Sequence, residues 1–181
     1  RKFTKNNFKV IAVTRNIHQK GYILKTQANP GYLEIVELSS FNPEKIKKLI
    51  KNCSVCINLT GILYEKRKNQ FKSIHTEFPH LLSKFSKELD IDQFIHLSSL
   101  GIEEAKDSKY AISKIEGENL VKNSFRKHVI LKPSVVYSVD DNFTTNFMNL
   151  LNILPIMPLY YGGKTKFTPI HVFDLVNIIF E

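Results

Sequence analysis

Residues 94–114 read FIHLSSLGIEEAKDSKYAISK, and this stretch decides the fold. It opens with a short apolar run that ends in two serines. After a loop comes a segment in which Ile112, Ile115 and Leu120 share one face at helical spacing. The stretch therefore predicts a strand, a loop and a helix over residues 108–123. A strand joined to a helix in this way is typical of the repeating unit of a parallel sheet.

The rest of the chain continues the alternation of strand and helix. We expect strands over residues 8–14, 32–38, 55–59, 94–97 and 128–131, helices over 43–52, 70–89 (kinked at Pro79) and 142–153, an extended segment at 168–172, and a last helix capped by Asp174. This order indicates an α/β fold of the Rossmann type, a doubly wound parallel sheet. Because no repeat or linker divides the sequence, residues 1–181 are predicted to form one domain.

The chain is basic, but unevenly so. Its formal net charge is +9; residues 1–90 hold 17 Lys and Arg against 7 Asp and Glu, whereas residues 91–181 hold 9 against 10. A basic half can serve nucleic acid, a membrane surface or a phosphorylated small ligand. Since 22 of the 26 basic residues are scattered lysines, without a strip of aromatic and Arg residues, we interpret them as solvated surface and expect no nucleic-acid partner.

Two features that suggest other classes of protein have simpler explanations. Cys53 and Cys56 form a C-x-x-C, which occurs in thioredoxin-like redox pairs and in halves of zinc sites, but no further cysteine or suitably spaced histidine pair completes a metal site. We favour core packing at the start of a buried strand. The most apolar stretch, residues 147–161, contains two prolines and is too short to cross a bilayer, so no transmembrane segment is expected.

A candidate catalytic site is carried by Ser99, Tyr110 and Lys114. On a helix, Tyr110 and Lys114 lie one turn apart and emerge on one face. A lysine ammonium beside a phenol favours the phenolate, so the tyrosine can exchange a proton with a carbonyl or hydroxyl. Ser99 ends the preceding strand, at the edge where parallel sheets bind ligands, and can hydrogen-bond the same oxygen. Y-x-x-x-K alone also occurs in ordinary solvated helices, but its position after this strand makes it specific.

These motifs resemble the short-chain dehydrogenase/reductase superfamily, in its extended or atypical, NAD-dependent epimerase/dehydratase-like branch. The resemblance covers nearly the whole chain in order. The segments that are similar to the ends of the family's second, fourth, fifth and sixth strands are residues 13–16, 57–61, 94–99 and 131–137. The resemblance implies that Ser99, Tyr110 and Lys114 are the catalytic triad.

The resemblance also implies a nicotinamide dinucleotide cofactor. Lys114 would hold the nicotinamide ribose. Arg15 directly follows the second family strand, where an acidic residue would bind the ribose 2′-hydroxyl of NAD and an arginine favours the 2′-phosphate of NADP, so NADP(H) is predicted, with NAD(H) as the alternative. The other expected cofactor contacts are Glu37, Leu59, Thr60, Gly61, Pro133, Ser134 and Val135.

The sequence departs from the family pattern at several positions. The Gly-rich G-x-x-G-x-x-G turn that cradles the pyrophosphate is absent from these 181 residues. His75 occupies the helix position where many members carry an asparagine of a proton relay, and it either points inward beside Pro79 or lies half-exposed. Ser138 stands where a glycine commonly follows the sixth strand, so that loop is expected to be less tight.

The absent Gly-rich turn predicts that these residues are an internal fragment of the fold. In the strand order 3-2-1-4-5-6, the first strand would lie between the strands at 8–14 and 55–59. We therefore expect a gap or a direct contact between those two strands, and no nucleotide binding by the fragment alone. The intact polypeptide is expected to begin ~20 to 30 residues earlier with a strand, a Gly-rich turn and a helix. Residues 140–181 would begin a small substrate-side region.

A narrower resemblance is to the NADPH-binding accessory subunit of respiratory complex I (NADH:ubiquinone oxidoreductase) and its bacterial relatives. The segments that carry it are residues 57–65, 74–79, 94–100, 108–118, 132–137, 141–143 and 169–175. It implies a structural NADPH without turnover, complex I subunits as partners, and a location in the cytoplasm or peripherally at the inner membrane. The intact triad implies the alternative, an active NAD(P)-dependent reductase, epimerase or dehydratase. A regulatory sensor is a third interpretation.

Overall fold

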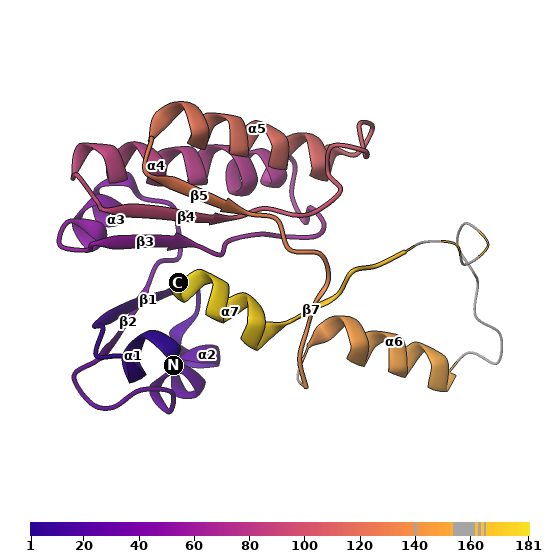
Figure 1. Ribbon diagram of the computed structural model, residues 1–181, viewed down its shortest axis with the longest axis horizontal. Coiled ribbons are helices and arrows are strands. Elements are labelled where there is room, and N and C mark those ends of the chain that lie inside the picture. Colours follow the sequence, from indigo (N-terminus) through magenta and orange to yellow (C-terminus); the bar gives the residue numbers. More distant parts are fainter. Residues whose placement is uncertain (140, 154–161, 163, 165) are drawn as a thin grey trace.

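Strands and helices alternate along the chain, as the sequence predicts (Figure 1). The computed structural model describes residues 1–139, 141–153, 162, 164 and 166–181. The first elements are α1 (Lys2–Lys5), β1 (Val10–Thr14), α2 (Ile17–Lys25), β2 (Leu33–Glu37), α3 (Pro43–Ile50) and β3 (Val55–Asn58). They are followed by the π-helix η1 (Lys72–Glu77), α4 (Phe78–Glu88), β4 (Gln93–Leu97), α5 (Lys109–Ser124), β5 (His128–Leu131), β6 (Val136–Tyr137), α6 (Asn142–Ile153), β7 (Ile170–His171) and α7 (Val172–Phe180).

Parallel strand pairing confirms the predicted α/β, Rossmann-like fold, and the sheet is divided. β1 pairs with β2, from Val10 opposite Leu33 to Thr14 opposite Glu37. β4 lies between β3 and β5, and the short β6 pairs with β7. In the part of the chain that the structure describes, no pairing joins β1 to β3. The sheet is therefore interrupted between the two strands where the sequence predicts a gap.

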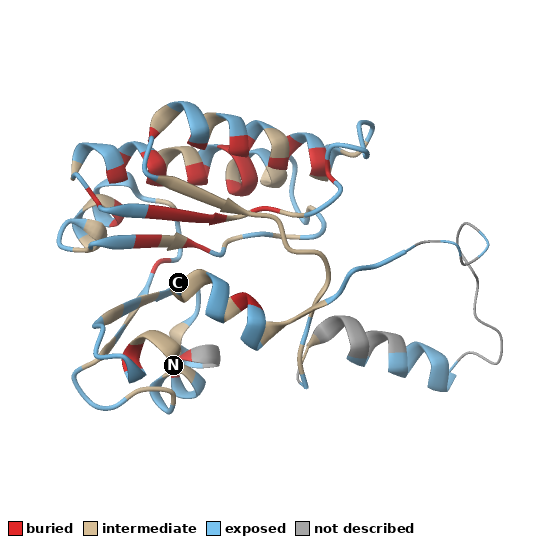
Figure 2. Ribbon diagram, in the orientation of Figure 1, coloured by how far each residue is buried: buried red, intermediate tan, exposed pale blue. Residues whose placement is uncertain are grey.

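The main apolar core lies between the β3–β4–β5 sheet and the helices α3, α4 and α5. Figure 2 shows buried residues concentrated in β4, α4 and α5. The core residues are Leu38, Ile46, Cys56, Phe78, Leu82, Phe85, Ile91, Phe94, Val121 and Phe125. Burying an apolar side chain of this size contributes roughly 1.5–3 kcal/mol, so these contacts hold the helices on the sheet.

Cys56 belongs to this core, as the core-packing interpretation predicts. It is a free thiol, and burial raises its pKa to about 12. Cys53 is also free and half-buried, and its Sγ donates to the carbonyl oxygen of Leu49 at 3.6 Å. Among the described residues, no group of three or more His, Cys, Asp or Glu side chains is placed to hold a metal ion. None of the helices described there has the length and apolar character needed to cross a bilayer.

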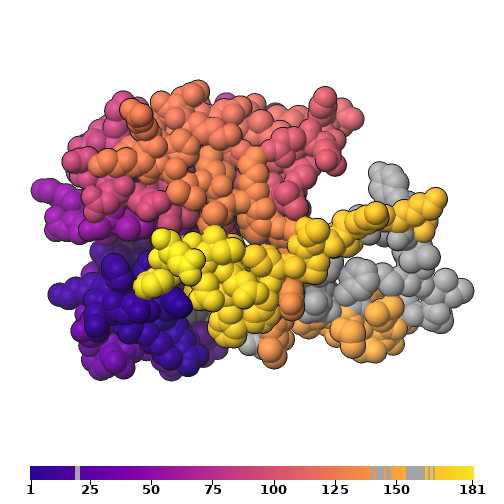
Figure 3. Space-filling model, viewed as in Figure 1, coloured from indigo at the N-terminus to yellow at the C-terminus, as the bar shows by residue number. Residues whose placement is uncertain are grey.

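The first and last helices of the chain pack against each other (Figure 3). The ring of Phe3 meets those of Phe8 and Phe180 edge to face, with centroids 5.8 Å and 5.2 Å apart. The ammonium of Lys2 donates to the side-chain oxygen of Asn177 at 3.0 Å. These contacts hold α7 on α1, beside the β1–β2 sheet.

The predicted helix over residues 70–89 is two helices. η1 is a π-helix, in which the N–H of Phe78 donates to the carbonyl oxygen of Ser73, five residues earlier. Pro79 stands in the first turn of α4. A proline there has no N–H to donate and a fixed φ suited to a helix start. A π-helical segment therefore stands directly before Pro79, at the place where the sequence predicts a kink.

Two further differences concern a helix that was not predicted and the cap of the last helix. The sequence did not predict α2, a short helix whose Tyr22 and Ile23 are exposed. The expectation that Asp174 caps the last helix is wrong. α7 begins after His171, whose Nδ1 accepts from the N–H of Phe173 at 3.3 Å. Asp174 lies in the first turn, where its negative charge suits the helix dipole.

Gly117 allows η1 and α5 to touch. A Cβ at position 117 would lie 1.9 Å from the carbonyl oxygen of His75, a backbone atom that cannot turn away. We predict that Gly117→Ala lowers the free energy of unfolding by about 1–3 kcal/mol, because the two helices must separate to admit one methyl group. The urea unfolding midpoint measures this. Asn119→Ala, at an exposed position of the same helix, is the control; equal midpoints for the two variants would contradict the prediction.

Candidate functional site

The carboxyl ends of β3, β4 and β5 meet at one edge of the sheet, and most expected site residues follow them. Leu59, Thr60 and Gly61 follow β3, Ser99 follows β4, and Pro133, Ser134 and Val135 follow β5. The pairing of β4 with β5 continues past the strands: Ser98 N donates to Leu131 O at 2.8 Å, and Leu100 N donates to Pro133 O at 3.0 Å. The half-buried Ser99 therefore stands on a hydrogen-bonded extension of the sheet.

Tyr110 and Lys114 share one face of α5, as their spacing predicts. The helix begins at Ser108, whose hydroxyl accepts from the N–H of Ala111 at 3.4 Å, so Tyr110 falls in the first turn. The Lys114 ammonium lies 6.0 Å from the centre of the Tyr110 ring. It donates to the carbonyl oxygen of Leu97 at 3.2 Å, at the end of β4 and two residues before Ser99. This bond fixes the buried lysine on the strand that carries the serine.

Gly61 lies close to α5 and to η1. A Cβ on Gly61 would lie 3.7 Å from the Lys114 ammonium and 3.9 Å from Nε2 of His75. The preceding turn is held by Asn58, whose side-chain oxygen accepts from the N–H of Thr60 at 3.0 Å. The structure thus brings the glycine backbone after β3 close to the ammonium of the lysine.

His75 points inward and joins the β3 loop to α5. Its side chain is 1% exposed, and its Nε2 accepts from the N–H of Ile62 at 3.1 Å. Since Nε2 accepts, Nδ1 carries the proton and donates to the Ser113 hydroxyl at 3.0 Å, which in turn donates to the carbonyl oxygen of Tyr110. The imidazole also meets the Tyr110 ring edge to face, with centroids 5.2 Å apart. Of the two expected orientations, the inward one is confirmed.

Two buried histidines at this edge are held neutral. Burial, followed by the charge of Lys114, lowers the pKa of His75 to about 4. The same two causes lower the pKa of His96, on β4, to about 4. Asn58 donates its side-chain N–H to Nδ1 of His96 at 3.1 Å when His96 carries its proton on Nε2. Both rings therefore act as neutral hydrogen-bonding groups around a single ammonium.

Arg15 and Glu37 lie on the other part of the divided sheet. Thr14 is paired with Glu37, so Arg15 follows β1 beside the end of β2. Arg15 is exposed, whereas the Glu37 carboxylate accepts from the N–H of Ile17 at 2.9 Å and so supports the start of α2. The structure groups these two residues with each other and not with the β3, β4 and β5 loops.

Four polar residues of this region were not singled out from the sequence: Asn58, His96, Ser113 and Glu118. All are buried. Only Glu118 carried a recognisable signal, since it lies one further helical turn after Lys114. The partners of the other three come from residues 38 positions away in the chain, a separation that no local pattern encodes.

The lowered pKa of His75 predicts acid sensitivity. In the unfolded chain the imidazole binds a proton near pH 6.5, whereas in the fold it does so only near pH 4. The contribution of neutral His75 to the free energy of unfolding is therefore fully present above pH 6.5, and it is lost as the pH drops towards 4. We expect His75→Gln to reduce the difference between the unfolding free energies measured at these two pH values, while replacing the exposed His18 by Gln leaves that difference as it is. The same pH difference in all three proteins would contradict this.

Comparisons with known proteins show which family and fold this chain shares. Mitochondrial NADH dehydrogenase (ubiquinone) 1 alpha subcomplex subunit 9 of Mus musculus is 30% identical over 152 residues, which are 84% of this chain and 40% of that protein. The chain thus spans well under half the length of this relative. UDP-glucuronic acid 4-epimerase from Bacillus cereus, solved with UDP-glucuronic acid and NAD, superposes with a TM-score of 0.74 at 19% identity, over 97% of this chain and 65% of that one.

A third similar structure is dTDP-4-dehydrorhamnose reductase from Bacillus anthracis in complex with NADP, with a TM-score of 0.62 at 16% identity, over 95% of this chain and 69% of that one. These structures share the fold, and each holds a nicotinamide dinucleotide. The family match itself spans residues 1–180. On its sequence and its parallel α/β fold, the chain belongs to the NAD dependent epimerase/dehydratase family.

Proposed function

We propose that the edge formed by Gly61, Tyr110 and Lys114 binds the nicotinamide half of a dinucleotide. The observation that carries the proposal is the buried Lys114 ammonium, held between the carbonyl oxygen of Leu97 and the Tyr110 ring and backed by Gly61. An ammonium has three N–H donors, and the hydroxyls of a ribose would accept from it beside the carbonyl oxygen of Leu97. Family membership supports the same ligand class.

The cofactor preferred in this proposal is NADP(H). Arg15 is exposed at the end of β1 and carries a guanidinium that can pair with a 2′-phosphate. The Glu37 carboxylate, which would repel that phosphate or accept from a ribose hydroxyl, is already bonded to the N–H of Ile17. Leu59, Thr60 and the segment Pro133 to Val135 would line the path between the two ends of the nucleotide.

The proposed role is that of a nucleotide-holding accessory subunit of respiratory complex I, bound peripherally at the inner membrane. The sequence similarity to the mouse NADH dehydrogenase subunit over 84% of the chain supports this role. We expect the full chain, tagged and isolated gently, to co-purify with NADH-oxidising activity and with complex I subunits identified by mass spectrometry. Recovery of the tagged protein free of respiratory subunits, together with turnover of a substrate, would contradict this role and favour the alternative.

The alternative is an NAD(P)-dependent reductase, epimerase or dehydratase, and the geometry of α5 favours it. Tyr110 is half-exposed and Lys114 lies one turn below it, so the phenol can give a proton to a substrate oxygen. Ser99 would hydrogen-bond the same oxygen. The nicotinamide, when bound, supplies or accepts hydride.

If the protein turns over a substrate, Tyr110→Phe should abolish that turnover, because only the hydroxyl is lost and it is the proton donor. The dinucleotide Kd, measured by calorimetry, should stay nearly unchanged, since the ring keeps its contact with His75. Activity within a few-fold of wild type in this variant would show that Tyr110 is not the acid.

Arg15 is predicted to set the preference between NADPH and NADH. NADPH is expected to bind about ten-fold or more tightly than NADH to the intact polypeptide that includes the expected first strand and Gly-rich turn, because charge-assisted bonds from Arg15 to the 2′-phosphate are worth roughly 1.5–3 kcal/mol. Arg15→Ala should remove this preference by weakening NADPH binding alone. Lys9→Ala, an exposed cation before β1, is the matched control. Calorimetric titrations that give the same NADPH to NADH ratio in wild type and Arg15→Ala would refute the assignment.

A further inference from the structure

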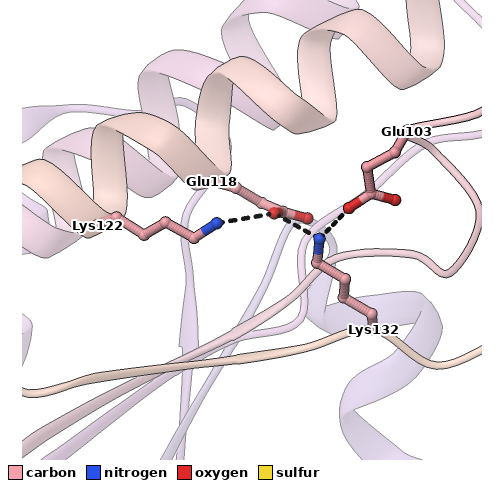
Figure 4. A network of polar contacts seen from close by, with 4 residues as sticks. All are labelled: Glu103, Glu118, Lys122 and Lys132. Atoms are coloured by element: carbon pink, nitrogen blue, oxygen red, sulfur yellow. Dashed lines mark hydrogen bonds and ion pairs between the residues drawn. The ribbon is translucent and has the colours of Figure 1, made fainter. Parts of the chain in front are cut away.

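A network of four charged residues lies beside the candidate site (Figure 4). Its centre is the carboxylate of Glu118, whose side chain is only 3% exposed. One oxygen of Glu118 lies 2.9 Å from the ammonium of Lys132 and 3.5 Å from that of Lys122. Lys132 also pairs with Glu103. The pair of Glu118 with Lys132, whose side chain is 30% exposed, is the least exposed pair of the network and is called its buried arm; the other two arms end at the exposed side chains of Glu103 and Lys122.

The buried arm joins the two segments that carry the candidate catalytic residues. Glu118 lies on α5, one turn after Lys114. Lys132 lies between Leu131 and Pro133, whose carbonyl oxygens accept from the N–H groups of Ser98 and Leu100, on either side of Ser99. Two backbone hydrogen bonds therefore connect the backbone around Lys132 to the segment that contains Ser99. The pair fixes α5 relative to that segment.

The negative charge of Glu118 also affects the ammonium of Lys114. Burial lowers the pKa of the Lys114 ammonium, and the charge of Glu118 raises it. The other titratable groups around Lys114 are Tyr110 on α5, His75 on η1 and His96 on β4. Both histidines are neutral near pH 7, since the pKa of each is about 4. Among these groups, the Glu118 carboxylate is the one that brings a compensating negative charge.

We propose that Glu118 is the positioning residue of the Ser99, Tyr110 and Lys114 site: its buried carboxylate holds α5 to the exit of β5 through Lys132 and balances the charge of Lys114. This inference rests on the proposed function for its consequence in binding. Its physical content, the coupling of Glu118 to Lys114, is independent of any nucleotide. Glu118 touches neither substrate nor cofactor in this scheme and acts through Lys132 and Lys114.

The coupling is tested by titrating Lys114 directly. The Nζ resonance of Lys114, assigned by its loss in Lys114→Arg, reports the pKa of the ammonium in the full chain without nucleotide. In Glu118→Gln that pKa should fall, because an opposing charge has been removed. In Lys132→Gln it should stay or rise, because Glu118 keeps its charge and loses a competing cation. If the two substitutions merely loosened the fold, the pKa of Lys114 would change in the same direction in both variants. A fall in Glu118→Gln without a fall in Lys132→Gln is therefore not explained by loosening.

The exposed arms supply the controls. The side chains of Glu103 and Lys122 are 56% and 48% exposed, and pairs of this kind couple weakly. Glu103→Gln and Lys122→Gln should therefore leave the Lys114 titration unchanged. Should a single variant leave an unpaired buried charge and fail to fold, the double variant Glu118→Gln with Lys132→Gln carries no such charge. It should still lower the pKa of Lys114, but by less than Glu118→Gln does, because the loss of the Lys132 cation partly offsets the loss of the carboxylate.

The binding consequence is measured with NADPH as the probe. The protein used is the intact polypeptide that includes the expected first strand and Gly-rich turn. In wild type the NADPH affinity should decline at high pH as Lys114 loses its proton, and in Glu118→Gln this decline should occur at a pH lower by the same amount as the NMR titration shows. An unchanged Lys114 pKa in both Glu118→Gln and the double variant would overturn the inference, as would equal falls in Glu118→Gln and Lys132→Gln. If wild type fails to bind NADPH while the Lys114 titration responds as expected, the proposed function fails and the coupling stands.

Discussion

The site depends on the contact between the backbone of η1 at His75 and Gly117 of α5. Because position 117 has no side chain, the two helices touch, and the imidazole of His75 reaches both Ser113 and the N–H of Ile62. Each ring nitrogen then has a partner, which a buried polar group requires. The widened π-helical turn before Pro79 is part of the same arrangement. The loop after β3 and the first turn of α5 are held together through one neutral histidine.

Around this contact, burial keeps the number of charged groups low. Lys114 is taken out of water and would be costly if left alone. It is compensated by the carbonyl oxygen of Leu97 and by the nearby carboxylate of Glu118. His75 and His96 lose their protons instead of adding two further positive charges. The edge therefore presents one cation beside a bare glycine, which suits a polar ligand with hydroxyl groups.

The division of the sheet separates two groups of site residues. Arg15 and Glu37 stand on the β1–β2 pair, whereas Gly61, Ser99, Tyr110 and Lys114 stand around the β3–β4–β5 sheet. In our proposal one dinucleotide contacts both groups, its phosphate-bearing end at Arg15 and its nicotinamide end at Lys114. Its binding would then also link the two sheets, so that nucleotide affinity and the stability of their arrangement depend on each other.

Local sequence determined most of the strands and helices, α2 excepted, and the shared face of Tyr110 and Lys114. β-branched runs and apolar faces at helical spacing predicted β1, β2, β3 and β5 to within two residues, because side-chain periodicity follows directly from strand and helix geometry. The i to i+4 spacing likewise predicted that Tyr110 and Lys114 share a face. Tertiary structure alone decided the inward position of His75, the π-helical turn, the partners of Asn58 and His96, and the link from Glu118 to Lys132. Each of these depends on contacts between residues far apart in the chain, and on burial, which sets charge states that a sequence pattern does not contain.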